Sequence, residues 1–147
     1  MDIIEARDAE RLEQCLRLRK EVFVAEQNVP EHLEVDELDT PDGACRHLLL
    51  VDRGEPVATA RVKRYDAQTA KIQRVAVKAA RRGQGCGRRI MEAAERLAAD
   101  LGYSYAVLDA QLQAEPFYGR LGYATESDEP FDDAGIMHVR MRKQLRP

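Results

Sequence analysis

Residues 82–87, with the sequence RGQGCG, form a glycine-rich turn between an apolar run at 72–77 and a helical pattern that follows. Glycines let a ligand approach the backbone closely, and the N-terminus of a helix presents unpaired NH groups and a positive dipole end. The segment therefore predicts an anion site that suits a diphosphate.

Two common diphosphate-binding motifs do not fit this turn. A dinucleotide fingerprint, GxGxxG, counted from the first glycine would need its third glycine where Arg88 stands. A P-loop would need a lysine and a hydroxyl residue after Gly87, where two arginines follow instead. We expect the backbone amides of residues 83–88 to supply most of the binding, and Arg82 to be the side chain best placed to assist.

The sequence on both sides of the turn predicts the strands and the helix that hold it in position. Apolar residues at positions 90, 94, 97 and 101 predict an amphipathic helix, Gly102 predicts its end, and residues 103–108 predict a strand. Strand, turn, helix and strand make a crossover unit. Its two strands can lie parallel, with the anion site at the carboxyl end of the first.

The rest of the chain predicts a meander before the turn and a short helix and two strands after it. We expect strands at 2–6, 47–51, 56–63, 70–77, 123–125 and 136–142, and helices from Asp8 to about Phe23 and at 115–121. Residues 27–43 are strongly acidic and predict an irregular connection.

Composition restricts the class of protein. The chain has 147 residues, 44% of them hydrophobic, which suits one domain with a single core over residues 1–147. A net charge of −3 and a pI near 5.7 argue against a nucleic-acid partner. Cys15, Cys45, Cys86 and three scattered histidines show neither disulfide nor zinc-site spacing, so we expect no metal. Without a signal pattern or a long apolar run, we expect a cytoplasmic protein with no membrane partner.

Two spaced motifs resemble the GNAT superfamily of N-acetyltransferases. They are RxxGxG at 82–87 and QLQAEPFYGRLGY at 111–123, in which an aromatic pair precedes a Leu-Gly-aromatic turn. The segments RKEVFVAEQ at 19–27 and GIMH at 135–138 are similar to a bacterial subgroup of small predicted acetyltransferases. The resemblance implies an α/β (α+β) fold: a mixed, mostly antiparallel sheet of about six to seven strands, flanked by about four helices, in which a splayed parallel strand pair binds acyl-CoA.

The same resemblance implies that acetyl-CoA is the donor and that the acetyl group passes directly from the thioester to an amine. Val75, Ala76 and Val77 would line the pantetheine arm through their backbone. The other donor contacts implied by the family pattern fall on Arg82, Gly83, Gln84, Gly85, Cys86, Gly87, Arg88, Gln113 and Phe117. Tyr118 matches the family tyrosine that protonates the leaving sulfur. The thiol of Cys86, at a helix N-terminus, leaves a covalent acyl-enzyme route open.

The residue that removes the amine proton is harder to assign, because Gln73 occupies a strand position where many relatives carry a carboxylate. We expect His138 or a carboxylate of the acidic segment to act as base through water, unless the acceptor amine is weakly basic. The alternative role for His138 is that of a strand histidine holding a backbone carbonyl.

The acceptor is expected to be a small molecule or a peptide with a primary amine. Carboxylates at 31–42 and 126–133 would favour a cationic amine if they line the acceptor entrance, and otherwise they are solvated surface. The sequence is compatible with a monomer or a homodimer.

Two other functions stay open. Arg19 and Phe23, followed by Glu34, Asp36 and Asp39, faintly resemble the N-terminal signature of acyl-homoserine lactone synthases, although the chain is short for that family. A non-catalytic module that binds acyl-CoA and regulates another protein is also consistent with Gln73 in place of a base.

Overall fold

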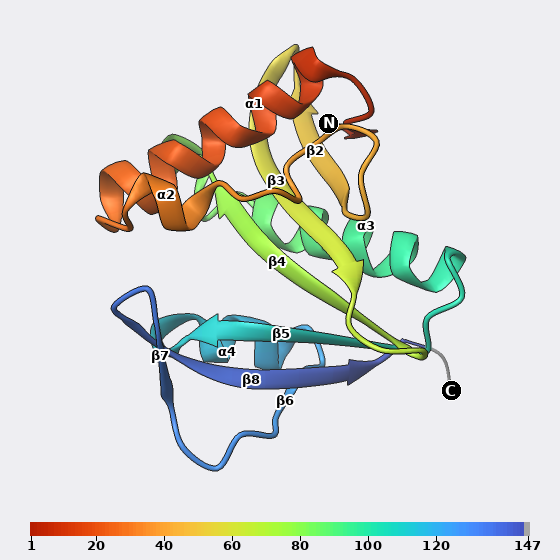
Figure 1. The fold of residues 1–147 in the computed structure, drawn as a ribbon, viewed down its shortest axis with the longest axis vertical. Helices are drawn as coiled ribbons and strands as arrows, with labels where there is room; N and C mark the ends of the chain where they lie inside the picture. The colour runs from red at the N-terminus through yellow and green to blue at the C-terminus, as the bar shows by residue number, and fades with distance from the viewer. Residues whose placement is uncertain (146–147) are drawn as a thin grey trace.

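A computed structural model describes residues 1–145 and contains one eight-stranded sheet with helices on both faces (Figure 1). The elements, in chain order, are β1 (Asp2–Glu5), α1 (Ala9–Arg19), a π-helix η1 (Lys20–Glu26), α2 (Glu31–Glu34), β2 (Arg46–Asp52), β3 (Glu55–Arg64), β4 (Thr69–Val77), a short 3-10 helix η2 (Ala79–Arg81), α3 (Cys86–Asp100), β5 (Tyr105–Gln111), a second 3-10 helix η3 (Leu112–Ala114), α4 (Glu115–Arg120), β6 (Ala124–Thr125), β7 (Phe131–Asp133) and β8 (Ile136–Gln144).

The sheet has the order β1-β2-β3-β4-β5-β8-β6, and β7 also pairs with β8. Within residues 1–145, every strand pairing is antiparallel except that of β4 with β5. The mixed, mostly antiparallel architecture predicted from the sequence is therefore confirmed. The strand that the sequence did not predict is β7, whose three residues carry too short a pattern to recognise.

Successive side chains along a strand point to opposite faces of the sheet, and each face packs into its own hydrophobic core. Leu48 and Leu50 face the larger core, which contains the buried side of α3, while Leu49 faces a smaller core beneath α1. The crossover helix α3 buries Ile90 and Ala94, as its sequence period predicts. The two helices therefore cover opposite faces of the N-terminal half of the sheet.

The first predicted helix changes type before it ends. α1 stops at Arg19 and continues as η1, in which the amide of Gln27 donates to the carbonyl of Val22, five residues earlier. Such wide turns occur often at functional sites. The segment after it was predicted to be irregular, but it contains the single turn of α2.

The two parallel strands are paired over only three residues. Thr69, Ala70 and Lys71 pair with residues 105–107, and beyond them β4 and β5 separate. Figure 1 shows the two strands meeting near the end of the described chain and diverging toward their carboxyl ends. A β-bulge lies in the separated part of β4, where Arg74 has a φ of 54°. The splayed pair is thus present, and its gap opens toward the glycine-rich turn.

No helix among residues 1–145 has the length and apolar character needed to cross a membrane. Within the same part of the chain, no group of three or more His, Cys, Asp or Glu side chains is placed to hold a metal ion. All three cysteines are buried as free thiols.

Candidate active site

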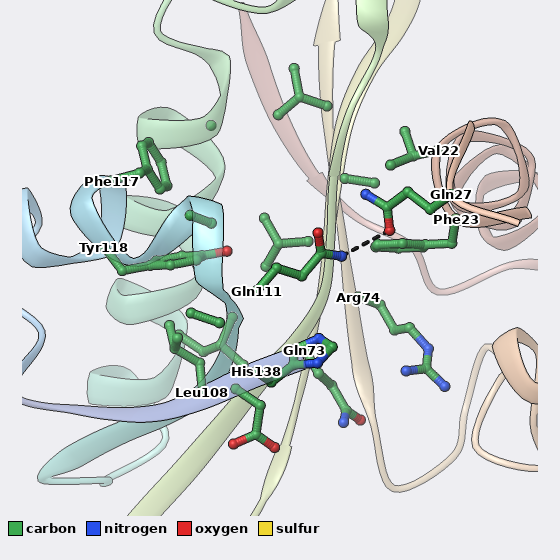
Figure 2. A pocket seen from close by; sticks show the side chains of 18 of the residues that line it. Val22, Phe23, Gln27, Gln73, Arg74, Leu108, Gln111, Phe117, Tyr118 and His138 are labelled. Atoms are coloured by element: carbon green, nitrogen blue, oxygen red, sulfur yellow. Dashed lines mark hydrogen bonds between the residues drawn. The ribbon is translucent and has the colours of Figure 1, made fainter. Parts of the chain in front are cut away.

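A cavity of about 800 Å³ lies in the gap between β4 and β5 (Figure 2). Its walls come from η1 and α2 on one side, from β4 and the glycine turn, and from β5, α4 and the β7–β8 hairpin on the other side. It brings together most of the predicted site residues: Val75, Ala76, Val77, Arg82, Gly83, Gly85, Cys86, Gly87, Arg88, Gln113, Phe117, Tyr118 and His138. Gln84 does not line it, because its side chain turns outward to accept a hydrogen bond from Arg81.

The glycine turn leaves its backbone open to a ligand. Gly83 and Gly85 have φ values of 77° and 83°, which favour glycine, and a Cβ on either would meet nothing within 4 Å. Gly85 precedes the first residue of α3, so the free amides of that 15-residue helix begin at the cavity. Gly87 packs tightly instead, because an added Cβ would lie 3.2 Å from Phe117. The turn and the aromatic side chain of α4 thus fix each other's position.

Arg82 and Arg88, on either side of the turn, each have a protein partner. Arg82 donates to Glu26 through Nη1 and Nη2, at 2.8 and 2.9 Å, and through Nε to the carbonyl of Val77 at 3.2 Å. Arg88 is exposed and donates to Glu92 at 2.8 Å. Both guanidiniums retain further NH groups, because each carries five.

Cys86 is placed poorly for nucleophilic chemistry. Its residue is 1% exposed and belongs to the main core cluster, although it begins α3 beside the cavity. A thiol in that position packs as a small apolar group. The geometry therefore favours direct transfer over the covalent route through Cys86.

The separated part of β4 offers a free backbone edge. Ala76 and Val77 pair with β3 on one side, but no β4–β5 pairing extends past Lys71. Successive NH and C=O groups of a strand point to alternate edges, so half of those beyond Lys71 face the cavity. This edge can bind an extended amide-containing ligand as a neighbouring strand would.

Tyr118 extends from α4 into the cavity, toward Gln111 (Figure 2). Its ring packs edge-on against Phe117 and Tyr123, with centroids 5.0 and 6.0 Å away. Burial raises the pKa of its hydroxyl to about 12. Because Tyr118 lines the cavity and keeps its proton in the neutral range, its hydroxyl can donate a hydrogen bond to a ligand there.

A chain of side-chain amides crosses the cavity, and the sequence analysis missed it. Nε2 of Gln111 donates to Oε1 of Gln27 at 2.8 Å, and Nε2 of Gln113 donates to Oε1 of Gln111 at 2.6 Å. Figure 2 shows the first bond spanning the gap between the end of β5 and the helix that carries Phe23. The partners are 84 residues apart in sequence, so no local pattern pointed to their contact.

His138 lies on β8, opposite Gln111, and is 9% exposed. Its Nδ1 is 2.7 Å from the carbonyl oxygen of Ile136, and since a carbonyl only accepts, Nδ1 carries the proton. The neutral ring therefore presents an unprotonated Nε2. The nearby amide oxygen of Gln73 is engaged by Arg61, at 3.0 and 2.6 Å.

The acidic segment holds two kinds of carboxylate. Glu31, Glu37 and Asp42 are exposed, as the interpretation as solvated surface predicts, whereas three others lie in ion pairs with buried arginines. Glu34 and Asp39 accept from buried Arg19, each at 2.7 Å, and Asp36 and Asp39 accept from buried Arg61, at 2.8 and 3.0 Å. Burial would raise the pKa of Asp39, but its hydrogen bonds lower it to about 2. These carboxylates stabilise the fold.

Arg74 links this ion-pair network to the cavity wall. Its Nε donates to the backbone carbonyl of Glu34 at 3.1 Å and lies 3.4 Å from Oε1 of that carboxylate. The other oxygen, Oε2, is buried and has no hydrogen-bond partner within residues 1–145. The charge of Glu34 is thus compensated by two arginines, while α2 is held against the bulge of β4.

A family model described as an acetyltransferase (GNAT) domain matches residues 6–145. The chain therefore belongs to the GNAT family of acetyltransferases. It is 41% identical over 143 residues to a Bacillus subtilis protein called uncharacterized N-acetyltransferase YjcF, covering 97% of this chain and 99% of that one.

Solved structures agree with the fold. An acyl-CoA N-acyltransferase from Pseudomonas aeruginosa is 34% identical, with a TM-score of 0.82 and 97% of each chain covered. An aminoglycoside 6'-N-acetyltransferase in complex with coenzyme A has a TM-score of 0.80, with 100% of this chain and 98% of that one covered. At 18% identity the second likeness concerns the fold alone.

Proposed function

We propose that this protein transfers an acetyl group from acetyl-CoA directly to the primary amine of a small molecule or a peptide. The observation that carries the proposal is the gap between β4 and β5, which opens beyond Lys71 and ends at the free amides of residues 83–88. Membership of the GNAT family supports the reaction class.

The donor would lie along this gap. The diphosphate binds the amides of the glycine turn with help from Arg82, and the pantetheine amides pair with the backbone edge of residues 75–77. Three or four charge-assisted hydrogen bonds, each worth about 1.5 to 3 kcal/mol, support micromolar affinity before ordering costs. The thioester then lies within the part of the cavity that Tyr118 lines.

The reaction needs two proton transfers of different difficulty. An alkylamine is neutral in about one molecule of 2,500 at pH 7, which costs about 4 to 5 kcal/mol, whereas a thiolate needs less assistance. In the transfer itself, the amine nitrogen forms a bond to the carbonyl carbon of the thioester, and the carbon–sulfur bond breaks. Nε2 of His138 takes the amine proton through water. Tyr118 protonates the departing sulfur.

The carboxylates near the cavity are weaker candidates for the base. Asp39 has its pKa lowered to about 2 against the effect of burial, and Asp109 likewise has its pKa held below the usual range by Arg140 and Lys71. Both are also engaged in short ion pairs. We therefore assign the base to His138, which lines the cavity and whose Nε2 is unprotonated in the neutral ring.

The direct test measures thiol release from acetyl-CoA with a panel of primary amines, together with calorimetry of CoA binding. We expect binding, and turnover that depends on the amine. Binding without transfer to any amine would favour the non-catalytic module, and lactone formation from an acyl carrier and S-adenosylmethionine would favour the synthase. Absence of CoA binding would refute the proposal.

A further inference from the structure

The part of the cavity that is lined by η1, α2 and the β7–β8 hairpin carries a group of apolar side chains. We call it the acceptor end and define it by Val22, Phe23, Val29, Leu33, Ala134 and Ile136, which come from η1, the following turn, α2 and the β7–β8 hairpin. Leu33 is 48% exposed there, although a leucine gains by leaving water. If acetyl-CoA enters from the glycine turn, as proposed above, this end receives the acceptor.

The carboxylates near the acceptor end are already compensated. Glu34 is 2% exposed and is shared by Arg19 and Arg74, and Asp109 pairs with Lys71 at 3.1 Å. Asp36 and Asp39 belong to the arginine network and do not line the cavity.

The remaining carboxylate that lines the cavity is Asp133, which sits exposed on the β7–β8 hairpin and is solvated there. Arg74 also lines the cavity, but it is held by the carbonyl groups of Leu33 and Glu34. The acceptor end therefore offers apolar surface and no buried, uncompensated carboxylate for a second ammonium group.

We propose that the acceptor is a monoamine carried on an apolar alkyl or aryl body, and that polycationic amines are poor substrates. Each methylene group of such a body gains by leaving water. A second ammonium group buried beside these apolar side chains would lose its hydration, because the free carboxylate of Asp133 is exposed and the buried one of Glu34 already has two arginine partners. This inference rests on the proposed function and names the class of its acceptor.

Hexylamine and cadaverine form a matched pair for the test, because cadaverine replaces the terminal methyl of hexylamine by an ammonium group at the same chain length. We expect kcat/KM for acetyl transfer to hexylamine to be at least about tenfold higher, after correction for the two amines of cadaverine. An equal or higher value for cadaverine, or for an aminoglycoside, would overturn the inference and leave the proposed function standing.

A binding measurement keeps the two proposals separable. Calorimetry with each amine, added to the protein saturated with CoA, should give tighter binding of hexylamine even if no acetyl transfer occurs. Failure of transfer to every amine would then count against the proposed function alone. Tighter binding of cadaverine would count against the acceptor class.

A charge placed at the acceptor end should change the preference. Leu33→Glu adds a carboxylate at an exposed position of the acceptor end. We expect this variant to lower the ratio of kcat/KM for hexylamine to kcat/KM for cadaverine by about tenfold. Ile3→Glu is the matched control, because Ile3 is 41% exposed on β1 and does not line the cavity. If Leu33→Glu leaves the ratio of kcat/KM for the two amines unchanged, the acceptor binds elsewhere and the inference is contradicted.

Discussion

Arg82 and Glu26 are joined by two hydrogen bonds, of 2.8 and 2.9 Å, which tie the glycine turn to the last residue of η1. Both side chains are partly exposed, at 46% and 37%, so the pair contributes at most about 1 kcal/mol to stability. A diphosphate carries more charge than one carboxylate, and it can therefore take Arg82 from Glu26. Glu26 thus keeps this arginine in place in the unliganded protein, and we expect the donor to displace it.

Glu26→Gln should therefore strengthen CoA binding. The neutral amide competes less for Arg82, and the loss of a surface pair predicts about a two- to fivefold lower Kd by calorimetry. Glu13→Gln is the control, because it makes the same charge change in an exposed pair with Arg17. An equal decrease in the Kd for CoA in both variants would show that the change in net charge, rather than the release of Arg82, is responsible.

Gly83→Ala should weaken CoA binding beyond its effect on stability. Gly83 has a φ of 77°, and Gly54, in the β2–β3 hairpin, has a φ of 80°, with no atom near a Cβ in either case. Each alanine variant should lose about 1 to 2 kcal/mol of unfolding free energy from backbone strain. Only Gly83→Ala should also raise the Kd for CoA, so a similar Kd in both variants would contradict the anion site.

Tyr118→Phe should lower kcat about 10- to 100-fold and leave the Kd for CoA unchanged. Burial raises the pKa of Tyr118 to about 12, so the hydroxyl keeps its proton throughout the neutral range and can donate a hydrogen bond to the sulfur as the C–S bond breaks. A thiol with a lower pKa leaves with less help from an acid. An acetyl thioester of such a thiol should therefore restore part of the rate that Tyr118→Phe loses. A variant as active as the wild type would remove Tyr118 from the mechanism.

His138→Gln should lower kcat/KM about 10- to 100-fold, because a side-chain amide cannot take the proton of the amine. The amide keeps a polar group next to the carbonyl of Ile136, which His138 now contacts at 2.7 Å. His32→Gln, at an exposed position on α2, is the control. An unchanged kcat/KM in His138→Gln would restrict this histidine to a structural role.

Asp39 should make stability depend on pH in the acid range. Its folded pKa of about 2 lies below the ordinary value of 3.8, so its contribution of about 2 kcal/mol is present above pH 4 and is lost as pH falls toward 2. Asp39→Asn should remove this dependence and cost about 3 kcal/mol at pH 7, because Arg19 and Arg61 each lose a partner. Urea unfolding at several pH values measures both effects, and equal slopes in the two proteins would contradict them.

The parts of the fold set by local patterns could be predicted from the sequence. The glycine turn, the period of α3 and the crossover all depend on residues close together in the chain, and all three are present. The partners of Arg19 and Arg61 could not be predicted in this way. Glu34 and Asp39 lie 15 and 20 residues from Arg19, in a segment whose acidic composition is also typical of solvated surface.

The same limit applies to the site. The hydrogen bond between Gln27 and Gln111 joins residues that only the completed sheet brings together, and the π-helix that positions Gln27 has no recognised sequence pattern. The point at which β4 and β5 separate depends on the bulge at Arg74 and on the packing of both half-sheets, which spacing alone does not encode.

The brief contact between β4 and β5 also bears on how proteins of this kind diversify. Because three residue pairs join the two halves of the sheet, substitutions in α2 or the β7–β8 hairpin can reshape one part of the cavity while the glycine turn keeps its geometry. Selection can thus exchange the molecule that is modified and retain the reagent that modifies it, with few compensating mutations in between.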